Sequence, residues 1–285
     1  MARPLRIEYP GAIYHITSRG NARRKIFKAD KDREAFLEIL RSVNRRYNLI
    51  CHCYCLMDNH YHLIIETPEG NLSKGMRQLN GIYTQSYNRR NNKLGHIFQG
   101  RYKAILIQKE SHLLEVCRYV ALNPVRAQAI NKPEEWKWSS YRATAGIEKS
   151  HSCLTRDWIL GQFSGRRRQA EKKYKEFVEA GIGGERIWKN VQGQSILGEE
   201  DFVESLIKYV KGYEEIKEIP KSQRYISRPK LAEIFTGRDA DKKKRNKYLH
   251  TAHVEYGYKL KEIADYLGIH YTTVSKAIKG EGAKN

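Results

Sequence analysis

The chain has 285 residues, of which 40% are hydrophobic and 30% charged, a balance typical of a globular protein rather than of a disordered one. Its 53 Lys and Arg residues outnumber 32 Asp and Glu residues, so the formal net charge at pH 7 is +21. In a compact fold these excess positive charges repel one another unless a polyanion supplies the opposite charge. We expect that polyanion to be nucleic acid. An anionic membrane surface would use the same charge, but the sequence has no apolar run of about 18 residues and predicts no membrane-spanning segment.

The first domain is predicted to contain strands and helices in the order β-α-β-β-α-β, followed by one more helix. Alternating apolar side chains predict four strands, at residues 13–19, 49–57, 61–67 and 103–108. Apolar residues at helical spacing predict three helices, at residues 30–47, 72–91 and 111–122. This order is that of the ferredoxin-like α+β fold, an antiparallel sheet with helices on one face. We expect the other face to be open to a nucleic-acid strand.

After residue 146 the chain becomes basic and helical. Near its end, an amphipathic helix, a turn near Gly268 and a second helix that opens with Thr272 form the pattern of a helix-turn-helix. We therefore predict the α+β domain at residues 1–146, a basic helical connector at 147–225 and an all-α, DNA-binding helix-turn-helix domain at 226–285. The alternative for the last segment is a helical bundle that serves only packing or dimerisation.

The cysteines and the N-terminus indicate the compartment. The cysteines are odd in number: Cys51, Cys53, Cys55, Cys117 and Cys153. They fit reduced thiols packed in the core of a cytoplasmic protein better than disulfides. A zinc site on the first three is the alternative, but a strand would spread their sulfurs over roughly 13 Å. No apolar stretch follows residues 1–6, so we expect no secretory signal.

His60 and His62 flank Tyr61 at the start of the third expected strand. Because residues i and i+2 of a strand point to the same face, the two imidazoles converge while Tyr61 faces away. Two neutral imidazoles on one face can hold a divalent metal. The alternative is a pair of half-buried histidines bonded to the backbone.

Tyr119 lies near the end of the third expected helix, and Asn123 is one turn further along on the same face. A helix laid across the sheet would bring this phenol and this amide to the histidines together. The amide oxygen would then offer a third metal ligand. The alternative is a tyrosine whose ring packs in the core, as many of the 19 tyrosines of this chain must do.

These residues carry a resemblance to the HUH single-tyrosine transposases, and within them to the REP-associated branch. It rests first on LMDNHYH at residues 56–62, and on Tyr119 with NPVRA at 123–127. Three flanking strings add to it: YHITSRGN at 14–21, FQGRYK at 98–103 and WSSY at 138–141. The match covers about residues 1–146, and five strings in the right order are far more specific than any one of them.

The resemblance implies a metal-dependent enzyme that cuts and rejoins single-stranded DNA near a hairpin repeat through a 5′-phosphotyrosine. It implies that Tyr119 is the nucleophile, that His60 and His62 hold Mg²⁺ or Mn²⁺, and that Asn123 is the third ligand. A cation beside the phenol lowers its pKa from about 10 and polarises the scissile phosphate. This sequence departs from the family at Asp58, where proline is usual, and at Asn123, where relatives often have glutamine.

Charged and amide side chains near the strand ends suit contacts to the DNA backbone and to unpaired base edges. We predict such contacts at Arg19, Asn21, Arg23, Arg24, Gln99, Arg101 and Lys103. The alternative for each is solvated loop charge. The string YTTVSK at 271–276 resembles the duplex-binding domain of the replication initiator DnaA. That resemblance implies contacts to duplex DNA by Tyr271, Thr272, Thr273 and Lys276.

Two other functions stay open at this point. One is a non-catalytic, sequence-specific DNA-binding regulator that keeps the fold. The other is an RNA-binding ferredoxin-like module, although its aromatic-rich strand motif is not clearly present. We expect the protein in the cytoplasm, associated with the bacterial nucleoid. It would act as a monomer or a homodimer, with the tyrosine serving the metal of its own chain or of a partner.

Overall fold

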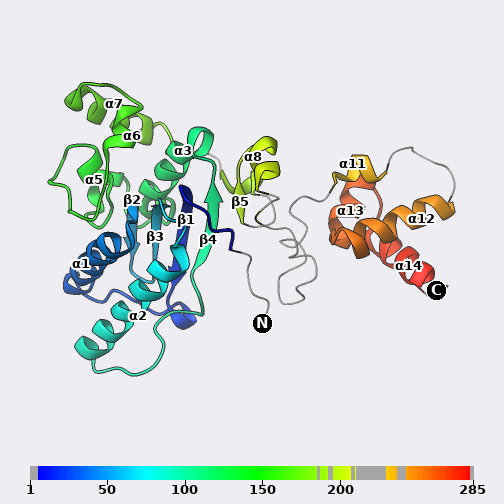
Figure 1. Ribbon diagram of the computed structural model, residues 1–285, viewed down its shortest axis with the longest axis horizontal. Helices are drawn as coiled ribbons and strands as arrows, with labels where there is room; N and C mark the ends of the chain where they lie inside the picture. Colours follow the sequence, from blue (N-terminus) through cyan, green and yellow to red (C-terminus); the bar gives the residue numbers. More distant parts are fainter. Residues whose placement is uncertain are drawn as a thin grey trace. The chain divides into compact units, whose positions relative to one another are not determined.

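A five-stranded sheet lies at the centre of the first part of the chain in the computed structural model (Figure 1). In spatial order the strands are β2 (Ile50–Met57), β3 (His60–Thr67), β1 (Ala12–Arg19), β4 (Lys103–Ile107) and β5 (Ile196–Leu197). β1 pairs antiparallel with β3 and β4, and β2 pairs antiparallel with β3. The predicted α+β, ferredoxin-like fold class is therefore confirmed. The sequence did not indicate β5, which adds a short parallel strand beside β4.

The structure describes residues 6–184, 187–191, 195–206, 209, 229–235 and 242–282. The chain divides into two units. The sheet unit comprises Arg6–Val191 and Ser195–Glu199. The helical unit comprises Met1–Leu5, Gln192–Gln194 and Glu200–Asn285. None of the described helices is both long and apolar enough to cross a lipid bilayer.

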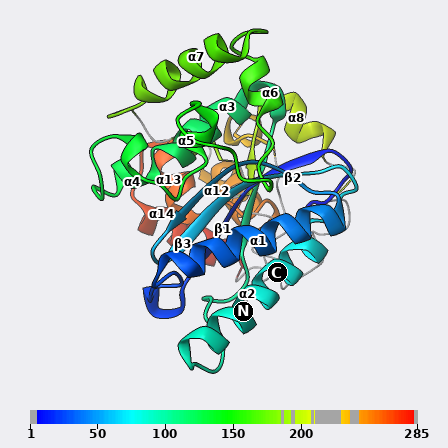
Figure 2. The same cartoon turned by 90° about the vertical axis from the view of Figure 1, so that its left-hand side faces the viewer.

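Helices α1 (Asp30–Tyr47) and α2 (Leu72–Asn91) cover one face of the sheet, with the bounds predicted from their apolar spacing (Figure 2). At the start of α1, the carboxylate of Asp32 accepts hydrogen bonds from the backbone N–H groups of Lys28 and Ala29, at 2.8 and 3.2 Å. Such acceptors satisfy the free donors of a helix N-terminus. Tyr61 points to this face as expected, with its ring 4.8 Å from that of Phe36.

The other face of the sheet is covered as well, so the expectation of an open face was wrong. α3 (Lys109–Ala121) crosses it, with α5 (Tyr141–Thr144), α6 (Asp157–Gly161) and α7 (Arg167–Glu179) on the same side (Figure 2). The sheet contributes apolar side chains to one core with these helices, among them Ile13, Cys53 and Ile64. The strands thus carry apolar residues on both faces, and both faces need cover.

Residues beyond 146 belong to this same core. Leu160, Tyr174 and Val178 are buried in it together with residues of β2 and α3. The predicted domain limits stay predictions, and the limit at residue 225 lies outside the described residues. The packing nevertheless joins α6 and α7 to the sheet unit rather than to a separate connector.

The string WSSY at 138–141 covers the outer edge of β2. Leu56 donates its backbone N–H to the carbonyl of Trp138 at 2.9 Å, and Ser140 donates to the carbonyl of Tyr54 at 2.9 Å. The N–H of Tyr54 also donates to the Ser140 hydroxyl, at 3.0 Å. Because an open strand edge is a template for aggregation, this segment protects the sheet.

The short 3-10 and α turns between these elements are η1 (Asn21–Arg23), α4 (Asn123–Arg126), η2 (Pro133–Glu135) and η3 (Ile187–Asn190). They connect strands and helices within the sheet unit. Two of them, η1 and α4, follow directly on elements that carry predicted site residues, β1 and α3.

The described part of the helical unit is all helix, as predicted for the C-terminal region. Its elements are α8 (Glu200–Ser205), α11 (Leu231–Ile234), α12 (Lys242–His250), η5 (Thr251–Glu255), α13 (Leu260–Leu267) and α14 (Tyr271–Gly282). Leu249, Ile263 and Val274 are buried in its small core. Gly268 ends α13 with φ +65°, a left-handed conformation that glycine adopts at little cost, and α14 begins three residues later.

Candidate functional site: a histidine pair beside Tyr119

The sheet register puts both predicted metal ligands opposite β1. His62 pairs with Thr17, and His60 pairs with Arg19. Paired residues of neighbouring strands share a face, so these side chains all lie on the face that α3 crosses. The rings of His60 and His62 lie 5.0 Å apart. The strand alternation used in the sequence argument therefore describes their placement correctly.

Each imidazole has its Nδ1 atom engaged by a neighbour. Nδ1 of His62 lies 2.8 Å from Nε2 of His15, and Nδ1 of His60 lies 2.7 Å from Oδ1 of Asn59. Nε2 of His62 is buried and has no hydrogen-bond partner among the described residues. Metal-binding histidines show this arrangement, in which one ring nitrogen is oriented by a partner and the other is left for the ion.

Both histidines are held in the neutral form. Burial and, to a smaller extent, the charge of Arg19 lower the pKa of His60 to about 4, while the Asn123 side chain opposes the shift. Burial also depresses the pKa of His62 strongly, with additional effects of His15, His60 and Arg19. A neutral imidazole offers a lone pair, which is what a metal ion requires.

α3 and α4 bring the other two predicted residues to this place. The Asn123 side chain is buried, and it raises the pKa of both His60 and His62, which indicates that it lies close to the two rings. The Tyr119 ring is partly exposed and lies edge-on to the rings of His15 and His62, with centroids 6.2 Å away in both cases. Tyr119, Asn123 and the two histidines thus meet on one face of the sheet although they come from separate elements.

Three further side chains that the sequence argument did not select belong to this cluster. His15 stacks on Trp188 at 4.8 Å, and Trp188 also lies edge-on to Tyr119 at 4.8 Å. The Arg126 guanidinium lies 5.3 Å from the centre of the Tyr119 ring, is exposed, and has no ion-pair partner among the described residues. His15 could have been found from its alternation with Thr17 and Arg19, whereas nothing in the sequence near Trp188 indicates its place.

A cavity of about 270 Å³ lies beside α4. It is lined by Leu122, Val125, Arg126, Gln128 and Gly181–Gly184. Arg126 therefore faces both the Tyr119 ring and an open space next to it.

The structure brings together the two groups of predicted DNA contacts in the sheet unit. The backbone N–H of Gln99 donates to the carbonyl of Arg19, and that of Asn21 donates to the carbonyl of Ile97, both at 2.8 Å. All seven predicted residues are exposed: Arg19, Asn21, Arg23, Arg24, Gln99, Arg101 and Lys103. None of the five cations among them is in an ion pair within the described part of the chain. They form one basic rim next to His60.

The predicted contacts in the helical unit lie on the first turns of α14. Tyr271, Thr272, Thr273 and Lys276 are all exposed. The Thr272 hydroxyl lies 2.8 Å from Nδ1 of His270 in the turn that precedes the helix. These side chains are thus available at the N-terminal end of a helix, the end that a helix-turn-helix presents to the major groove.

The cysteines do not build a metal site. All five are free and buried. A bulge between Cys51 and Cys53 further disturbs the alternation on which a shared face would depend. Among the residues that the structure describes, no group of three or more His, Cys, Asp or Glu side chains could hold a metal ion.

One family of known proteins matches part of the sheet unit in sequence. The sequence model of the family described as "Transposase IS200 like" matches residues 9–123, the range that holds His15, the histidine pair, Tyr119 and Asn123. Over this range the chain is similar to IS200-like transposases. No match was found among curated proteins.

The chain is also similar to several solved structures. The structure of a REP-associated tyrosine transposase bound to a REP hairpin is 18% identical, covers 55% of this chain and 93% of its own, and has a TM-score of 0.46. A putative transposase from Deinococcus radiodurans is 16% identical, with 41% and 95% covered and a TM-score of 0.31. The tRNA(His) guanylyltransferase of Saccharomyces cerevisiae is 10% identical, with 66% and 85% covered and a TM-score of 0.33. At these identities the likeness concerns the fold alone.

Proposed function

We propose that the sheet unit is a metal-dependent endonuclease and strand transferase that acts on single-stranded DNA near hairpin repeats. The observation that carries this proposal is the meeting of Tyr119, Asn123, His60 and His62 on one face of the sheet. The match of residues 9–123 to IS200-like transposases supports it independently.

The donor set fits a divalent ion such as Mg²⁺ or Mn²⁺. Nε2 of His62 is a buried nitrogen that has no hydrogen-bond partner within the described part of the chain, and both imidazoles are neutral. His60, His62 and the Asn123 amide oxygen would hold the ion, which would polarise the scissile phosphate and favour the phenolate of Tyr119. The two histidines are kept in orientation by His15 and Asn59.

Tyr119 is the nucleophile in this proposal. Its hydroxyl loses a proton to solvent and attacks the phosphorus, the bond from phosphorus to the 3′ oxygen breaks, and the leaving oxygen takes up a proton. The DNA is then joined to Tyr119 through a 5′-phosphate, and the reverse attack by a 3′-hydroxyl rejoins a strand without ATP. Arg126, 5.3 Å from the ring, supplies a positive charge beside the reacting phosphate.

The two basic surfaces bind different forms of DNA in this scheme. The basic rim beside His60 holds the unpaired strand and its hairpin, since exposed arginines and amides can contact both phosphates and base edges. In the helical unit, Tyr271, Thr272, Thr273 and Lys276 on α14 bind duplex DNA in the manner of a helix-turn-helix.

The test is covalent capture. The full chain is incubated with Mn²⁺ and a labelled single strand that carries a hairpin, and the products are separated under denaturing conditions. We expect a covalent adduct that survives detergent and maps to Tyr119. Tyr119→Phe should abolish this adduct and retain DNA binding. Tyr47→Phe is the matched control, since Tyr47 bonds to Gln78 away from the histidines. A wild-type chain that binds many hairpins and never forms an adduct would instead be a non-catalytic DNA-binding regulator.

A further inference from the structure

The Asn59 side chain contacts both the basic rim and a proposed metal ligand. Its Nδ2 atom lies 3.2 Å from the backbone carbonyl of Arg23. Its Oδ1 atom lies 2.7 Å from Nδ1 of His60. One amide therefore joins the loop after β1 to the histidine at the start of β3.

The chemistry of these groups fixes where the protons lie. A backbone carbonyl can only accept, so the amide must turn its NH₂ group toward Arg23. Its oxygen then faces His60, and since this oxygen can only accept, Nδ1 of the neutral ring must carry the proton. Nε2 of His60 is left with its lone pair.

We propose that the Arg23 carbonyl, acting through Asn59, sets the tautomer of His60 that can bind metal, and so links the DNA-binding loop to the metal site. Asn59 is then a positioning residue. This inference rests on the proposed function, because it assigns a purpose to the orientation of His60 toward the proposed ion.

The loop is built so that this carbonyl points at Asn59. Ala22 and Arg23 both have left-handed backbones, with φ of +51° and +57°. Residues other than glycine rarely adopt this backbone conformation. Two such residues in succession persist only where surrounding contacts impose the conformation. Gly20 allows the turn, since a Cβ there would lie 2.0 Å from the carbonyl oxygen of Arg24. The Gly20 N–H in turn donates to the carbonyl of Asn59, at 2.8 Å.

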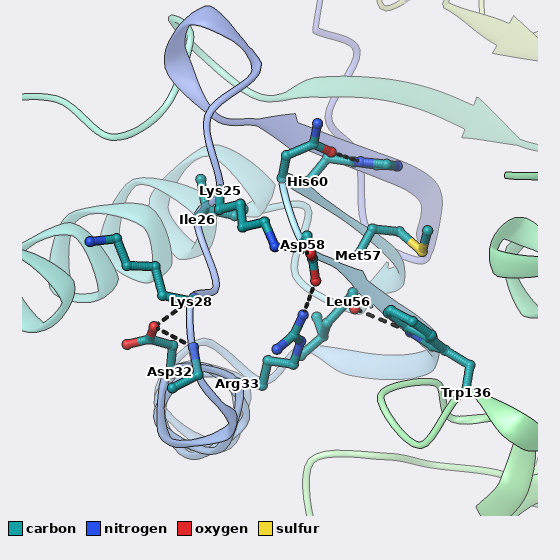
Figure 3. Close-up of polar contacts among 12 residues, drawn as sticks. Lys25, Ile26, Lys28, Asp32, Arg33, Leu56, Met57, Asp58, His60 and Trp136 are labelled. Carbon is teal, nitrogen blue, oxygen red and sulfur yellow. Dashed lines mark hydrogen bonds and ion pairs between the residues drawn. The ribbon is translucent and has the colours of Figure 1, made fainter. Parts of the chain in front are cut away.

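The turn that contains Asp58 is bonded to the segment that follows this loop, and Asp58 lies near Lys25 and Ile26 (Figure 3). The carbonyl of Asp58 accepts from the backbone N–H groups of Ile26 and Phe27, at 2.9 and 3.0 Å. Its carboxylate pairs with Lys25 at 2.8 Å and with the nearly buried Arg33. These ionic contacts anchor the turn that precedes His60. The loop and the turn are thus held as one piece, and a shift of one moves the other.

His62 has no such link. Its Nδ1 is held by His15, a side chain within β1, so its orientation depends on the sheet and not on the loop. Among the described contacts, the loop that carries Arg23 is bonded through Asn59 to His60 and not to His62. DNA bound by the loop and metal bound at His60 share the Asn59 anchor, and each should therefore strengthen binding of the other by the same factor.

The first measurement is the tautomer of His60 in the full chain without metal or DNA, by ¹⁵N NMR of the histidine rings. We expect the Nδ1–H form. Asn59→Ala removes both contacts, so the Nε2–H form should appear and Mn²⁺ affinity should fall about 10- to 100-fold. Asn59→Asp keeps an acceptor for His60 but has no donor for the Arg23 carbonyl. It should retain the Nδ1–H form and Mn²⁺ binding, which a general loss of folding would not allow.

The second measurement is the Mn²⁺ affinity with and without a bound hairpin strand. The wild type should bind Mn²⁺ more tightly with DNA, and Asn59→Asp should lose that gain. Asn91→Ala is the control, because this amide donates to the carbonyl of Tyr87 within α2, away from His60. The ¹⁵N NMR signals of the His62 ring should be the same in all variants.

The inference is overturned if wild-type His60 carries its proton on Nε2, if Asn59→Ala leaves the tautomer and Mn²⁺ affinity unchanged, or if Asn59→Asp keeps the full gain with DNA. The tautomer is measured without metal or DNA, so it does not depend on adduct formation. An Nδ1–H tautomer in a chain that forms no adduct would contradict the proposed function alone.

Discussion

Asp58→Asn is the most informative test of how the turn before His60 is held. The Asp58 carboxylate pairs with Arg33 and Lys25, and the substitution leaves the Arg33 charge without its partner. Breaking a fully buried ion pair in this way costs about 3–5 kcal/mol, whereas exposed pairs contribute about 0–1 kcal/mol. The side chains are 7% exposed for Arg33 and 43% for Asp58, so the pair lies between these limits. We expect the free energy of unfolding to fall by about 2 kcal/mol.

The assay is urea unfolding followed by tryptophan fluorescence. All four tryptophans, Trp136, Trp138, Trp158 and Trp188, lie in the sheet unit, so the signal reports on that unit. Asp157→Asn is the matched control, since its ion pair with Arg167 is 3.4 Å long and Asp157 is 87% exposed. That variant should lose less than about 0.5 kcal/mol.

The pH dependence follows from the same contacts. Burial raises the pKa of Asp58, but the hydrogen bonds and charges of Lys25 and Arg33 outweigh it, so the pKa lies below its ordinary value. A carboxyl group with a lowered pKa stabilises the fold above its unfolded pKa of about 3.9 and loses this contribution as the pH falls through the folded pKa. The difference between wild type and Asp58→Asn should therefore be full at pH 7 and shrink below about pH 4.

A double-mutant cycle with Arg33→Met decides whether the pair itself is responsible. The double variant should be more stable than the sum of the two single losses predicts, by about 1 kcal/mol, because the charge that Asp58→Asn leaves unpaired is gone. Additive losses, or an Asp58→Asn variant as stable as the wild type, would refute the reasoning.

Three other predictions concern the site and the two units. Arg126→Ala should slow adduct formation about 10-fold in single-turnover assays at unchanged DNA affinity, because it removes the cation beside Tyr119; an equal loss of binding would indicate a plain DNA contact. A chain ending after residue 199 should keep adduct formation, whereas one ending after residue 150 should fail to fold by circular dichroism, because α6 and α7 complete the core; a folded, active shorter form would contradict this. Lys276→Ala should weaken duplex binding and reduce the salt slope of log K by about 1 without changing cleavage of single strands; an unchanged slope would remove α14 from the interface.

Local patterns in the sequence determined much of this protein. The bounds of α1 and α2 follow from apolar residues at helical spacing, and the strand alternation places His60 and His62 on one face with Tyr61 on the other. The four-residue step from Tyr119 to Asn123 likewise brings both to the histidines. These features depend on residues close together in the chain, whose geometry is set by the periods of helix and strand.

Only the tertiary structure decided what surrounds these residues. His15 lies 47 positions before His62, and Arg23 lies 36 positions before Asn59, yet each pair is in hydrogen-bond contact. Trp188 comes from beyond α7 to pack on Tyr119. The cover of the second sheet face by α3, α6 and α7 also brings together segments from distant parts of the chain. Such contacts arise from the packing of whole elements, and no local period in the sequence encodes which distant side chain will occupy a given place.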